Sequence, residues 1–346
     1  MQKIAIVGAS TLLGKELKEL LLDSPLAAAE IILFDEEDVL GQLEQLGDEV
    51  TFLGRVTAES FEGVDFAFFT GTHALTDKHW RQAVRSNCPV IDLSGSLDKD
   101  AGVMVRAPWL MVKTSGADLL TTAIVAADPA AVALALLMER LAKAAPVRFA
   151  AATVLQPASQ LGSGAMDELH QQTVNLLSFQ TLPRAVFDAQ TAYNMLGGFG
   201  ESAPTALNEC ADRVRRHYQR LAGPEGARLL IQVLQAPIFH GHCFSMAVEF
   251  EHATDLSSIE QALSGEHIDL VLEDTDTPSN LAATGQNDLL VRVKPEGVTE
   301  TIHVAGSSPV TKLWLWVATD NLRVNAANAI ECALELEKMR PRGKVQ

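Results

Sequence analysis

The sequence of 346 residues is poor in the features that mark secreted, membrane and metal-binding proteins. It has four cysteines, far apart and without a CxxC pair, so neither a disulfide framework nor a zinc ribbon is expected. No apolar run is long enough to span a membrane, because the nearest candidate, residues 130–138, is followed at once by Glu139 and Arg140. We therefore expect a cytoplasmic protein that binds no membrane.

Basic residues are also scarce. The chain has 27 Lys and Arg against 44 Asp and Glu, a net charge of −17. A field of that sign repels phosphate backbones and anionic lipid, so nucleic acid is not an expected partner. The hydrophobic fraction of 47% and the length indicate a globular chain with two domains.

Short apolar runs alternate with amphipathic stretches in the first part of the chain. The expected strands are residues 4–7, 31–34, 66–69 and 90–93, and the expected helices are residues 15–22 and 77–86. Alternating strands and helices predict a parallel sheet covered on both faces. This is the α/β fold class with a Rossmann-type domain.

Beyond Pro146 strands and helices no longer alternate strictly, which predicts an α+β second domain. The expected strands are residues 149–155, 229–233, 243–250 and 289–293, and the expected helices are 166–177 and 208–221. A long closing helix is predicted over residues 321–339, with Asp320 as its N-cap.

The first strand runs into a glycine turn. Gly8 permits a tight turn and Gly14 permits close packing of the helix on the strand, whereas the middle glycine of such turns is replaced by Thr11. Two interpretations stay open: a Rossmann-like turn that binds nothing, or a nucleotide-binding turn. In the second, the pyrophosphate contacts lie at Gly8, Ser10, Thr11, Leu12 and Gly14.

An acidic residue, Asp35, follows the second expected strand. A carboxylate there can accept hydrogen bonds from a ribose 2′-hydroxyl and repels a 2′-phosphate, which favours NAD over NADP. The alternative is that the acidic run 35–38 is a solvated loop.

Several segments resemble, in the same order, motifs of the aspartate-semialdehyde dehydrogenase family, and most of all its divergent USG proteins. They are Gly8-Ala9-Ser10 with Gly14, residues 66–70, Val90-Ile91-Asp92 with Ser94, Asp128-Pro129, Gln156 with Ser159, residues 164–169, Ala192-Tyr193-Asn194-Met195, Pro237 with Gly241-His242, and Asp320-Asn321-Leu322-Arg323. The resemblance implies reduction of an acyl phosphate to an aldehyde with NADPH, through a thioester on a cysteine.

The resemblance also implies a domain organisation and partners. We expect a Rossmann-type NAD(P)-binding domain over 1–130 and an α+β dimerisation and substrate-type domain over 131–320. The C-terminal helix, 321–346, is expected to return to the first domain. The expected assembly is a homodimer, or a heterodimer with a related dehydrogenase.

The residue that resemblance places at the nucleophile position is Ala131, not cysteine. A helix N-terminus and a nearby histidine lower a thiol pKa, but a methyl group cannot attack a carbonyl. Cys243 follows His242 on an expected strand, where neighbours point to opposite faces, so it is not expected to substitute. Cys88, Cys210, Cys243 and Cys332 are all expected to be small buried hydrophobic residues.

The resemblance implies two arginines that bind the substrate anions, and this chain has Asp98 and Gln235 at those positions. At the positions of the lysine and glycine in the family's closing-helix motif it has Val324 and Asn325. Glutamine supplies no charge and aspartate repels an anion. His242 and Gln156 remain at family site positions, either as vestigial catalytic residues or for packing.

Three hypotheses follow. The first is a pseudoenzyme that keeps a dimeric NAD(P)-binding fold. The second is an active NAD(P)-dependent oxidoreductase acting on an aldehyde or oxo group in amino-acid biosynthesis, with His242 as acid or base. The third is a structural relic. No metal site is expected, because His240 and His242, taken to share a strand face, have no evident third ligand.

Overall fold

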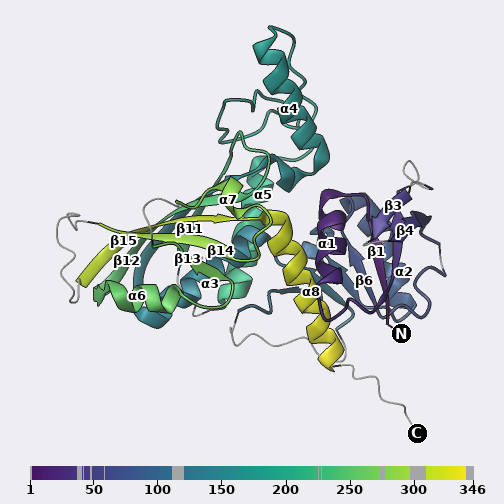
Figure 1. Cartoon of the computed structure of the whole chain (residues 1–346), viewed down its shortest axis with the longest axis horizontal. Coiled ribbons are helices and arrows are strands. Elements are labelled where there is room, and N and C mark those ends of the chain that lie inside the picture. The colour runs from purple at the N-terminus through teal and green to yellow at the C-terminus, as the bar shows by residue number, and fades with distance from the viewer. Residues whose placement is uncertain are drawn as a thin grey trace. The chain divides into compact units, whose positions relative to one another are not determined.

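The chain forms two compact units (Figure 1). The computed structural model describes residues 2–36, 41, 43–46, 49–57, 59–110, 121–224, 226, 228–272, 277–296 and 309–339. The first unit comprises Met1–Asp128 and Asn325–Gln346, and the second comprises Pro129–Val324. Glu37 and Asp38 of the acidic run lie outside the described residues.

The first unit is built on a parallel sheet of seven strands in the order β5-β2-β1-β6-β7-β9-β8. Its strands are β1 (Lys3–Val7), β2 (Glu30–Asp35), β5 (Gly54–Arg55), β6 (Phe66–Phe69), β7 (Val90–Asp92), β8 (Met104–Arg106) and β9 (Ala123–Ala126). Its helices are α1 (Leu12–Leu22), α2 (His73–Arg85) and the 3₁₀ helix η2 (Ser96–Lys99), and β3 (Leu43–Leu46) with β4 (Glu49–Phe52) forms a separate hairpin. The central strands are buried on both faces, as parallel sheets require.

The closing helix α8 (Asn321–Met339) forms with the predicted start, and from Asn325 on it belongs to the first unit. Asp320 Oδ1 accepts the backbone N–H groups of Leu322 and Arg323, which confirms the predicted N-cap. Ala326, Ile330 and other α8 residues share a core cluster with the buried residues of β1, α1 and β6. The prediction that this helix returns to the first domain is confirmed.

The second unit contains a mixed sheet of six strands in the order β11-β10-β12-β15-β14-β13. They are β10 (Val147–Gln156), β11 (Leu229–Gln235), β12 (His242–Asp255), β13 (Ile268–Leu270), β14 (Leu289–Pro295) and β15 (Pro309–Thr319). Its helices are α3 (Pro129–Ala144), η3 (Ala158–Leu161), α4 (Ser163–Leu177), α5 (Leu207–Ala222), α6 (Leu256–Leu263) and α7 (Asn280–Ala283). The predicted α+β character is therefore confirmed.

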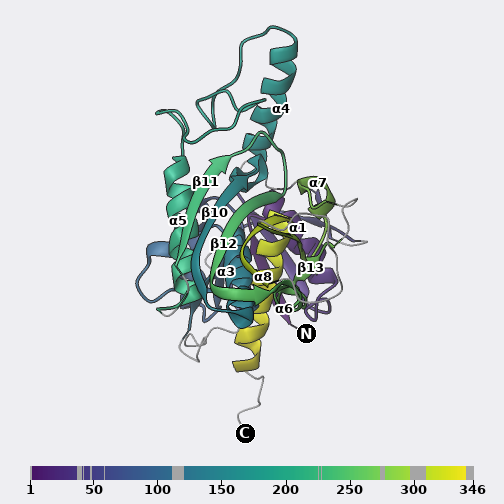
Figure 2. The same ribbon diagram turned by 90° about the vertical axis from the view of Figure 1, so that its left-hand side faces the viewer.

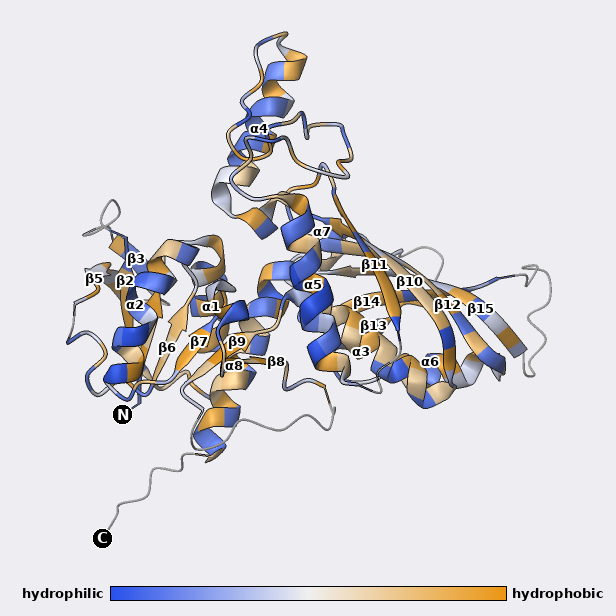
Figure 3. Cartoon of the chain, turned by 180° about the vertical axis from the view of Figure 1, so that it is seen from behind, coloured by the Kyte–Doolittle hydropathy of each residue, from blue (hydrophilic) through white to orange (hydrophobic). Residues whose placement is uncertain are grey.

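The two faces of this sheet differ. Along β10 the even-numbered residues from Ala150 to Gln156 are buried, on the side of α3, α5 and α6, and the odd-numbered ones are partly open. Figure 3 shows that α3 is largely hydrophobic, as expected for a buried helix. In contrast, α5 has a hydrophilic outer surface and buries only one side. The opposite face includes Leu230 and Trp314, which are 65% and 46% exposed.

One expectation about the histidines is wrong. β12 begins at His242, so His240 is not on a strand. Gly241, with φ of +83°, turns the chain between the two histidines, and the alternation rule does not apply to His240. Among the described residues no group of three or more His, Cys, Asp or Glu side chains is arranged to hold a metal ion, and no described helix is long and apolar enough to cross a membrane.

Candidate functional site

The glycine turn of the first unit is tightly packed against neighbouring backbone. Gly8 has φ of +91°, and a Cβ there would lie 2.3 Å from the nitrogen of Gly71. A Cβ on Gly14 would lie 2.5 Å from the carbonyl oxygen of Gly8. Both positions therefore require glycine, because the turn lies against the backbone after β6 and α1 lies against the turn.

Thr11, which replaces the middle glycine, is the N-cap of α1. Its Oγ1 accepts the N–H of Gly14 at 3.0 Å and donates to the carbonyl of Gly8 at 2.8 Å. The first backbone N–H groups of a helix have no partner within the helix. The side chain of Thr11 accepts the N–H of Gly14. The N–H groups of Leu12 and Leu13 lie in the same first turn, where the helix dipole favours binding of an anion.

Asp35, at the end of β2, is buried beside this turn. Its Oδ2 accepts the N–H of Ser10 at 2.6 Å and its Oδ1 accepts the N–H of Glu36 at 2.8 Å. Asp35 thus fixes the shape of the turn. A carboxylate oxygen has a second lone pair, so Asp35 also retains acceptor capacity. A cavity of about 430 Å³ adjoins it, with Arg55 and Lys78 among its lining residues.

In the second unit, four polar side chains form a row across one end of the sheet, on the face covered by helices. Gln235 pairs with Gln156, and His242 pairs with Thr319. Gln156 lies one step beyond the Leu155–Cys243 pair, which puts it beside His242. All four are at most 2% exposed. Neighbouring strands are about 4.8 Å apart, so the row is a continuous polar strip inside an apolar layer.

The two glutamines of this polar row satisfy each other. Gln156 Nε2 donates to Gln235 Oε1 at 3.2 Å, while Gln235 Nε2 donates to the carbonyls of Gln156 and Ala236 at 3.0 and 3.1 Å. In contrast, Thr319 Oγ1 has no hydrogen-bond partner among the described residues. One end of the row is therefore the hydrogen-bonded pair of Gln156 and Gln235, and the other end is the buried hydroxyl of Thr319.

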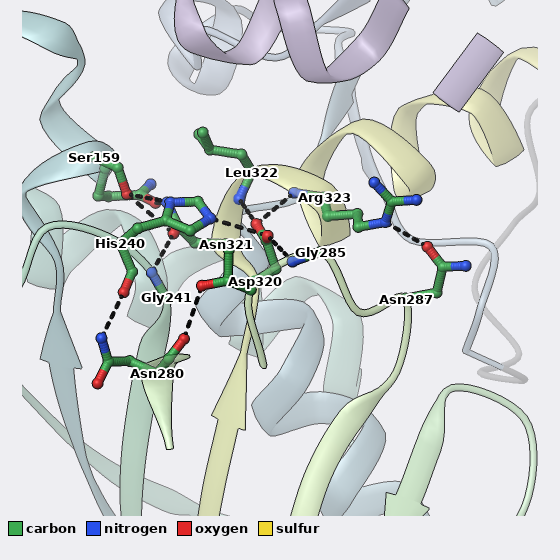
Figure 4. A network of polar contacts seen from close by, with 12 residues as sticks. Ser159, His240, Gly241, Asn280, Gly285, Asn287, Asp320, Asn321, Leu322 and Arg323 are labelled. Atoms are coloured by element: carbon green, nitrogen blue, oxygen red, sulfur yellow. Dashed lines mark hydrogen bonds and ion pairs between the residues drawn. The ribbon is translucent and has the colours of Figure 1, made fainter. Parts of the chain in front are cut away.

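A second polar network lies where α8 begins (Figure 4). His240 Nε2 is 2.9 Å from Asp320 Oδ2, and His240 Nδ1 is 3.0 Å from Ser159 Oγ. Asn321 Oδ1 accepts from Ser159 Oγ and from the N–H of Gly241, both at 3.1 Å. These contacts join η3, the loop before β12 and the start of α8.

This network resembles a Ser-His-Asp triad in composition but not in accessibility. Ser159 is 2% exposed, and its backbone N–H is used by the carbonyl of Phe239. Burial by itself raises the pKa of Asp320, but hydrogen bonds from His240, Gly285 and Arg323 outweigh that effect and bring the pKa below its ordinary value. The arrangement stabilises a carboxylate and holds three segments together; it offers no exposed nucleophile.

Comparisons with known proteins match both units. Residues 3–120 match the model of the semialdehyde dehydrogenase NAD-binding domain, and residues 138–324 match the semialdehyde dehydrogenase dimerisation domain. A USG-1 protein homolog of Azotobacter vinelandii is 31% identical over 345 residues, covering 95% of this chain and 96% of that protein. The chain belongs to the aspartate-semialdehyde dehydrogenase family.

Other members of the family agree with this assignment. The aspartate-semialdehyde dehydrogenase of Rickettsia bellii is 24% identical, covering 97% of each chain. The structure of a probable aspartate-semialdehyde dehydrogenase from Pseudomonas aeruginosa has a TM-score of 0.82 at 24% identity, with 98% of this chain and 99% of that one covered. At that identity the structural likeness bears on the fold alone.

The residue that the resemblance placed at the family's nucleophile position lies in the first turn of α3. Ala131 has no exposed surface, and Pro129, Ala130 and Val132 beside it are also buried. The first turn of this helix therefore carries only apolar side chains, with no nucleophilic atom.

Cys243 lies on the opposite side of β12 from His242. It packs with Ala283 and Ala318 in a small apolar cluster. Burial raises the pKa of the Cys243 thiol to about 11. A thiol with such a pKa remains protonated near neutral pH and is a poor nucleophile. Cys88 and Cys332 are buried too, whereas Cys210 is half-buried, so the expectation of burial is wrong for Cys210.

The residues aligned with the family's two arginines lie in different units. Asp98 is buried in η2, and Asp92, which accepts the N–H groups of Ser94 and Leu97, holds the loop that leads to it. Gln235 belongs to the amide pair described above.

Some parts of these sites were missed at the level of sequence. Thr319 was overlooked because β15 was not predicted, although Thr319 immediately precedes the Asp320 motif. The pairing of His240 with Asp320 depends on contacts across 80 residues of sequence, for which local pattern gives no signal.

Proposed function

We propose that this chain is a pseudoenzyme of the aspartate-semialdehyde dehydrogenase family: a dimeric, nucleotide-binding protein without the thioester reaction. The observation that carries the proposal is the first turn of α3, where Ala131 stands at the position that the family resemblance assigns to the nucleophile. A methyl group forms no acyl adduct. Cys243, next to the retained His242, lies on the other face of β12 with a pKa raised to about 11.

Loss of the anion-binding arginines supports the same proposal. Gln235 is fully buried and its amide is used by Gln156 and by two backbone carbonyls. Binding a substrate carboxylate there would require breaking these bonds and would supply no positive charge in return. Asp98, at the second arginine position, brings a negative charge. The two substitutions remove the complement of an anionic substrate as well as the nucleophile.

Nucleotide binding is the function most compatible with the first unit. Gly8 and Gly14 are both required by close backbone contacts, as in a Rossmann turn, and the first turn of α1 directs its N–H groups to the site where a pyrophosphate would bind. Gly8, Ser10, Thr11, Leu12 and Gly14 would line the pyrophosphate site, where the N–H of Leu12 in the first turn of α1 would be the backbone donor, and Asp35 would accept a ribose hydroxyl. A bound nicotinamide nucleotide supplies hydride chemistry. The carboxylate of Asp35 favours NAD over NADP.

Homodimer formation is supported by the second unit, which matches a dimerisation domain. The sheet face opposite α3, α5 and α6 carries small residues such as Ala151 and Ala247 beside the exposed Leu230 and Trp314. An open sheet face that exposes large hydrophobic side chains is buried in stable oligomers. A heterodimer with a related dehydrogenase would use the same face.

An enzyme assay tests the pseudoenzyme proposal, and a thermal-shift assay tests nucleotide binding. Purified protein with aspartate semialdehyde, phosphate and NADP or NAD is expected to give no absorbance change at the nicotinamide band, under conditions where a cysteine-containing family enzyme is active. NAD is expected to raise the melting temperature in a concentration-dependent way, since a ligand that binds only the folded state stabilises it. Turnover would refute the pseudoenzyme, and a melting temperature unmoved by millimolar NAD or NADP would refute nucleotide binding.

A second candidate function rests on His242. It lies between Gln156 and Thr319 in the polar row, and a histidine can serve as a general acid or base. Non-covalent hydride transfer to an aldehyde or oxo group would need neither cysteine nor arginine clamp. NADH oxidation by neutral aldehydes, lost in His242→Ala and kept in His240→Ala, would favour this candidate over the pseudoenzyme.

A further inference from the structure

The hairpin of β3 and β4, at the margin of the first unit, presents an apolar face to solvent (Figure 1). The two strands form a sheet of their own, and in the part of the chain that the structure describes no third strand pairs with either. Leu43 pairs with Phe52, and Gln45 pairs with Val50, so these side chains share one face. Leu43, Val50 and Phe52 are 62%, 63% and 67% exposed. These three residues are referred to below as the hairpin face.

Contacts on the opposite side hold the hairpin against the first unit. Glu44, which follows Leu43 along β3, lies on that opposite side, and its carboxylate pairs with Nζ of Lys18 on α1. The Lys18 side chain is only 4% exposed. Leu53, next after β4, is buried in the core cluster that α1 shares with α8, and Figure 2 shows α8 beside α1. The hairpin face is thus turned outward by contacts on its inner side.

This distribution of side chains is the reverse of that of an ordinary surface hairpin. A charged residue, Glu44, lies inward against α1, whereas the apolar residues of the hairpin face lie outward. Natural sheets keep exposed edges polar or cover them, because an uncovered apolar strand pairs with other chains. Exposed aromatic and aliphatic side chains beside a free strand edge suit an extended segment of a partner, which adds as a further strand.

The charge around the hairpin determines the chemistry of that partner. Between Lys18 and Arg55 the chain contains ten acidic residues and no lysine or arginine. Lys18 itself is paired with Glu44. A negative potential of this kind repels nucleic acid, anionic membranes, acidic peptides and the same surface of a second copy, and it attracts lysine and arginine side chains.

We propose that the hairpin face is a docking site for an extended basic segment of another protein, in which apolar residues alternate with lysine or arginine. Successive side chains of a strand point to opposite faces of the sheet. The apolar side chains of the partner then cover Leu43, Val50 and Phe52, and its basic side chains lie on the side of Glu44. The site is on the first unit and depends neither on the homodimer nor on the loss of the thioester reaction.

Two fluorescent peptides of about nine residues, a length that spans a typical strand, test the docking site. In the first, valine and phenylalanine alternate with lysine, and in the second, glutamate replaces lysine. Fluorescence anisotropy is expected to give a dissociation constant of about 0.1 mM for the lysine peptide, as for a small transient contact, and at least about tenfold weaker binding for the glutamate peptide.

Phe52→Ser removes the aromatic side chain of the hairpin face and is expected to weaken binding of the lysine peptide at least about tenfold. Leu281→Ser is the matched control, because Leu281 is 81% exposed on α7 of the second unit, and it is expected to leave the affinity unchanged. Both changes are at exposed side chains, so the melting temperatures are expected to stay within a few degrees of wild type.

Amide hydrogen exchange locates the bound peptide. An added strand occupies outward backbone groups, so exchange in β3 or β4 is expected to slow when the lysine peptide binds. Equal affinities of wild type and Phe52→Ser, or unchanged exchange in both strands, would show that the peptide binds elsewhere and would overturn the proposal. No binding of the lysine peptide up to about 1 mM, or tighter binding of the glutamate peptide, would overturn it too.

Discussion

Asp320 joins the start of α8 to Gly285 and His240, and replacing it gives a quantitative test. Asp320 is 2% exposed, and its Oδ1 caps α8 through Leu322 and Arg323. Its Oδ2 accepts the N–H of Gly285 at 2.9 Å and lies 2.9 Å from His240 Nε2. Loss of an N-cap costs about 1 kcal/mol, and a buried N–H left without an acceptor costs about 1–3 kcal/mol.

Asp320→Ala is therefore expected to lower the free energy of unfolding by about 3 kcal/mol at neutral pH, when the loss of the His240 contact is included. Asp320→Asn keeps the cap, because asparagine is as good an N-cap as aspartate, and is expected to cost about half as much. Urea unfolding followed by circular dichroism measures both differences. A loss below about 0.5 kcal/mol for Asp320→Ala would refute the role assigned to this residue.

The pH dependence has a definite sign. The pKa of Asp320 is lowered in the folded protein, so its charge contributes stability that is complete above the ordinary pKa of about 3.9. That contribution is lost as the pH falls through the lowered folded pKa. The difference between wild type and Asp320→Asn should thus shrink below about pH 4. A difference that stays constant down to pH 3 would contradict the assignment of the charge.

Three further changes test other parts of the structure. Gly8→Ala puts a Cβ 2.3 Å from the nitrogen of Gly71 at a φ of +91°, and is expected to lower the melting temperature by several degrees in calorimetry. Glu168→Ala leaves two backbone N–H groups, of Val186 and Phe187, without their acceptor, and amide hydrogen exchange there should accelerate more than tenfold. Ala131→Cys should restore a thiol but no turnover of aspartate semialdehyde in the absorbance assay, because Gln235 still supplies no charge.

Much of the fold follows from local pattern. The glycine turn predicted the start of a parallel sheet because Gly8 and Gly14 are required by backbone contact, and Asp320 predicted the start of α8 because an aspartate side chain caps a helix locally. β15 was not predicted, although it lies between two other strands of its sheet. It is a central strand only because of pairing with residues distant in sequence, which periodicity alone does not reveal.

The candidate sites were predicted in part. His242 and Gln156 were singled out from sequence, and the structure brings them together on adjacent strands. Their setting could not be predicted, because the mutual bonds of Gln156 and Gln235 depend on strand register. His240 was placed on the wrong element, since the positive φ of Gly241 that ends the strand pattern is a property of the folded backbone.

Without a cysteine at position 131, no covalent acyl adduct is expected to form on this chain, and intact-mass spectrometry tests this directly. The protein is incubated with aspartate semialdehyde and NADP or NAD in the absence of phosphate, quenched in acid and weighed beside a cysteine-containing member of the family. This protein is expected to keep its unmodified mass, and the enzyme is expected to carry an aspartyl adduct. An aspartyl adduct on Cys88, Cys210, Cys243 or Cys332 would contradict it.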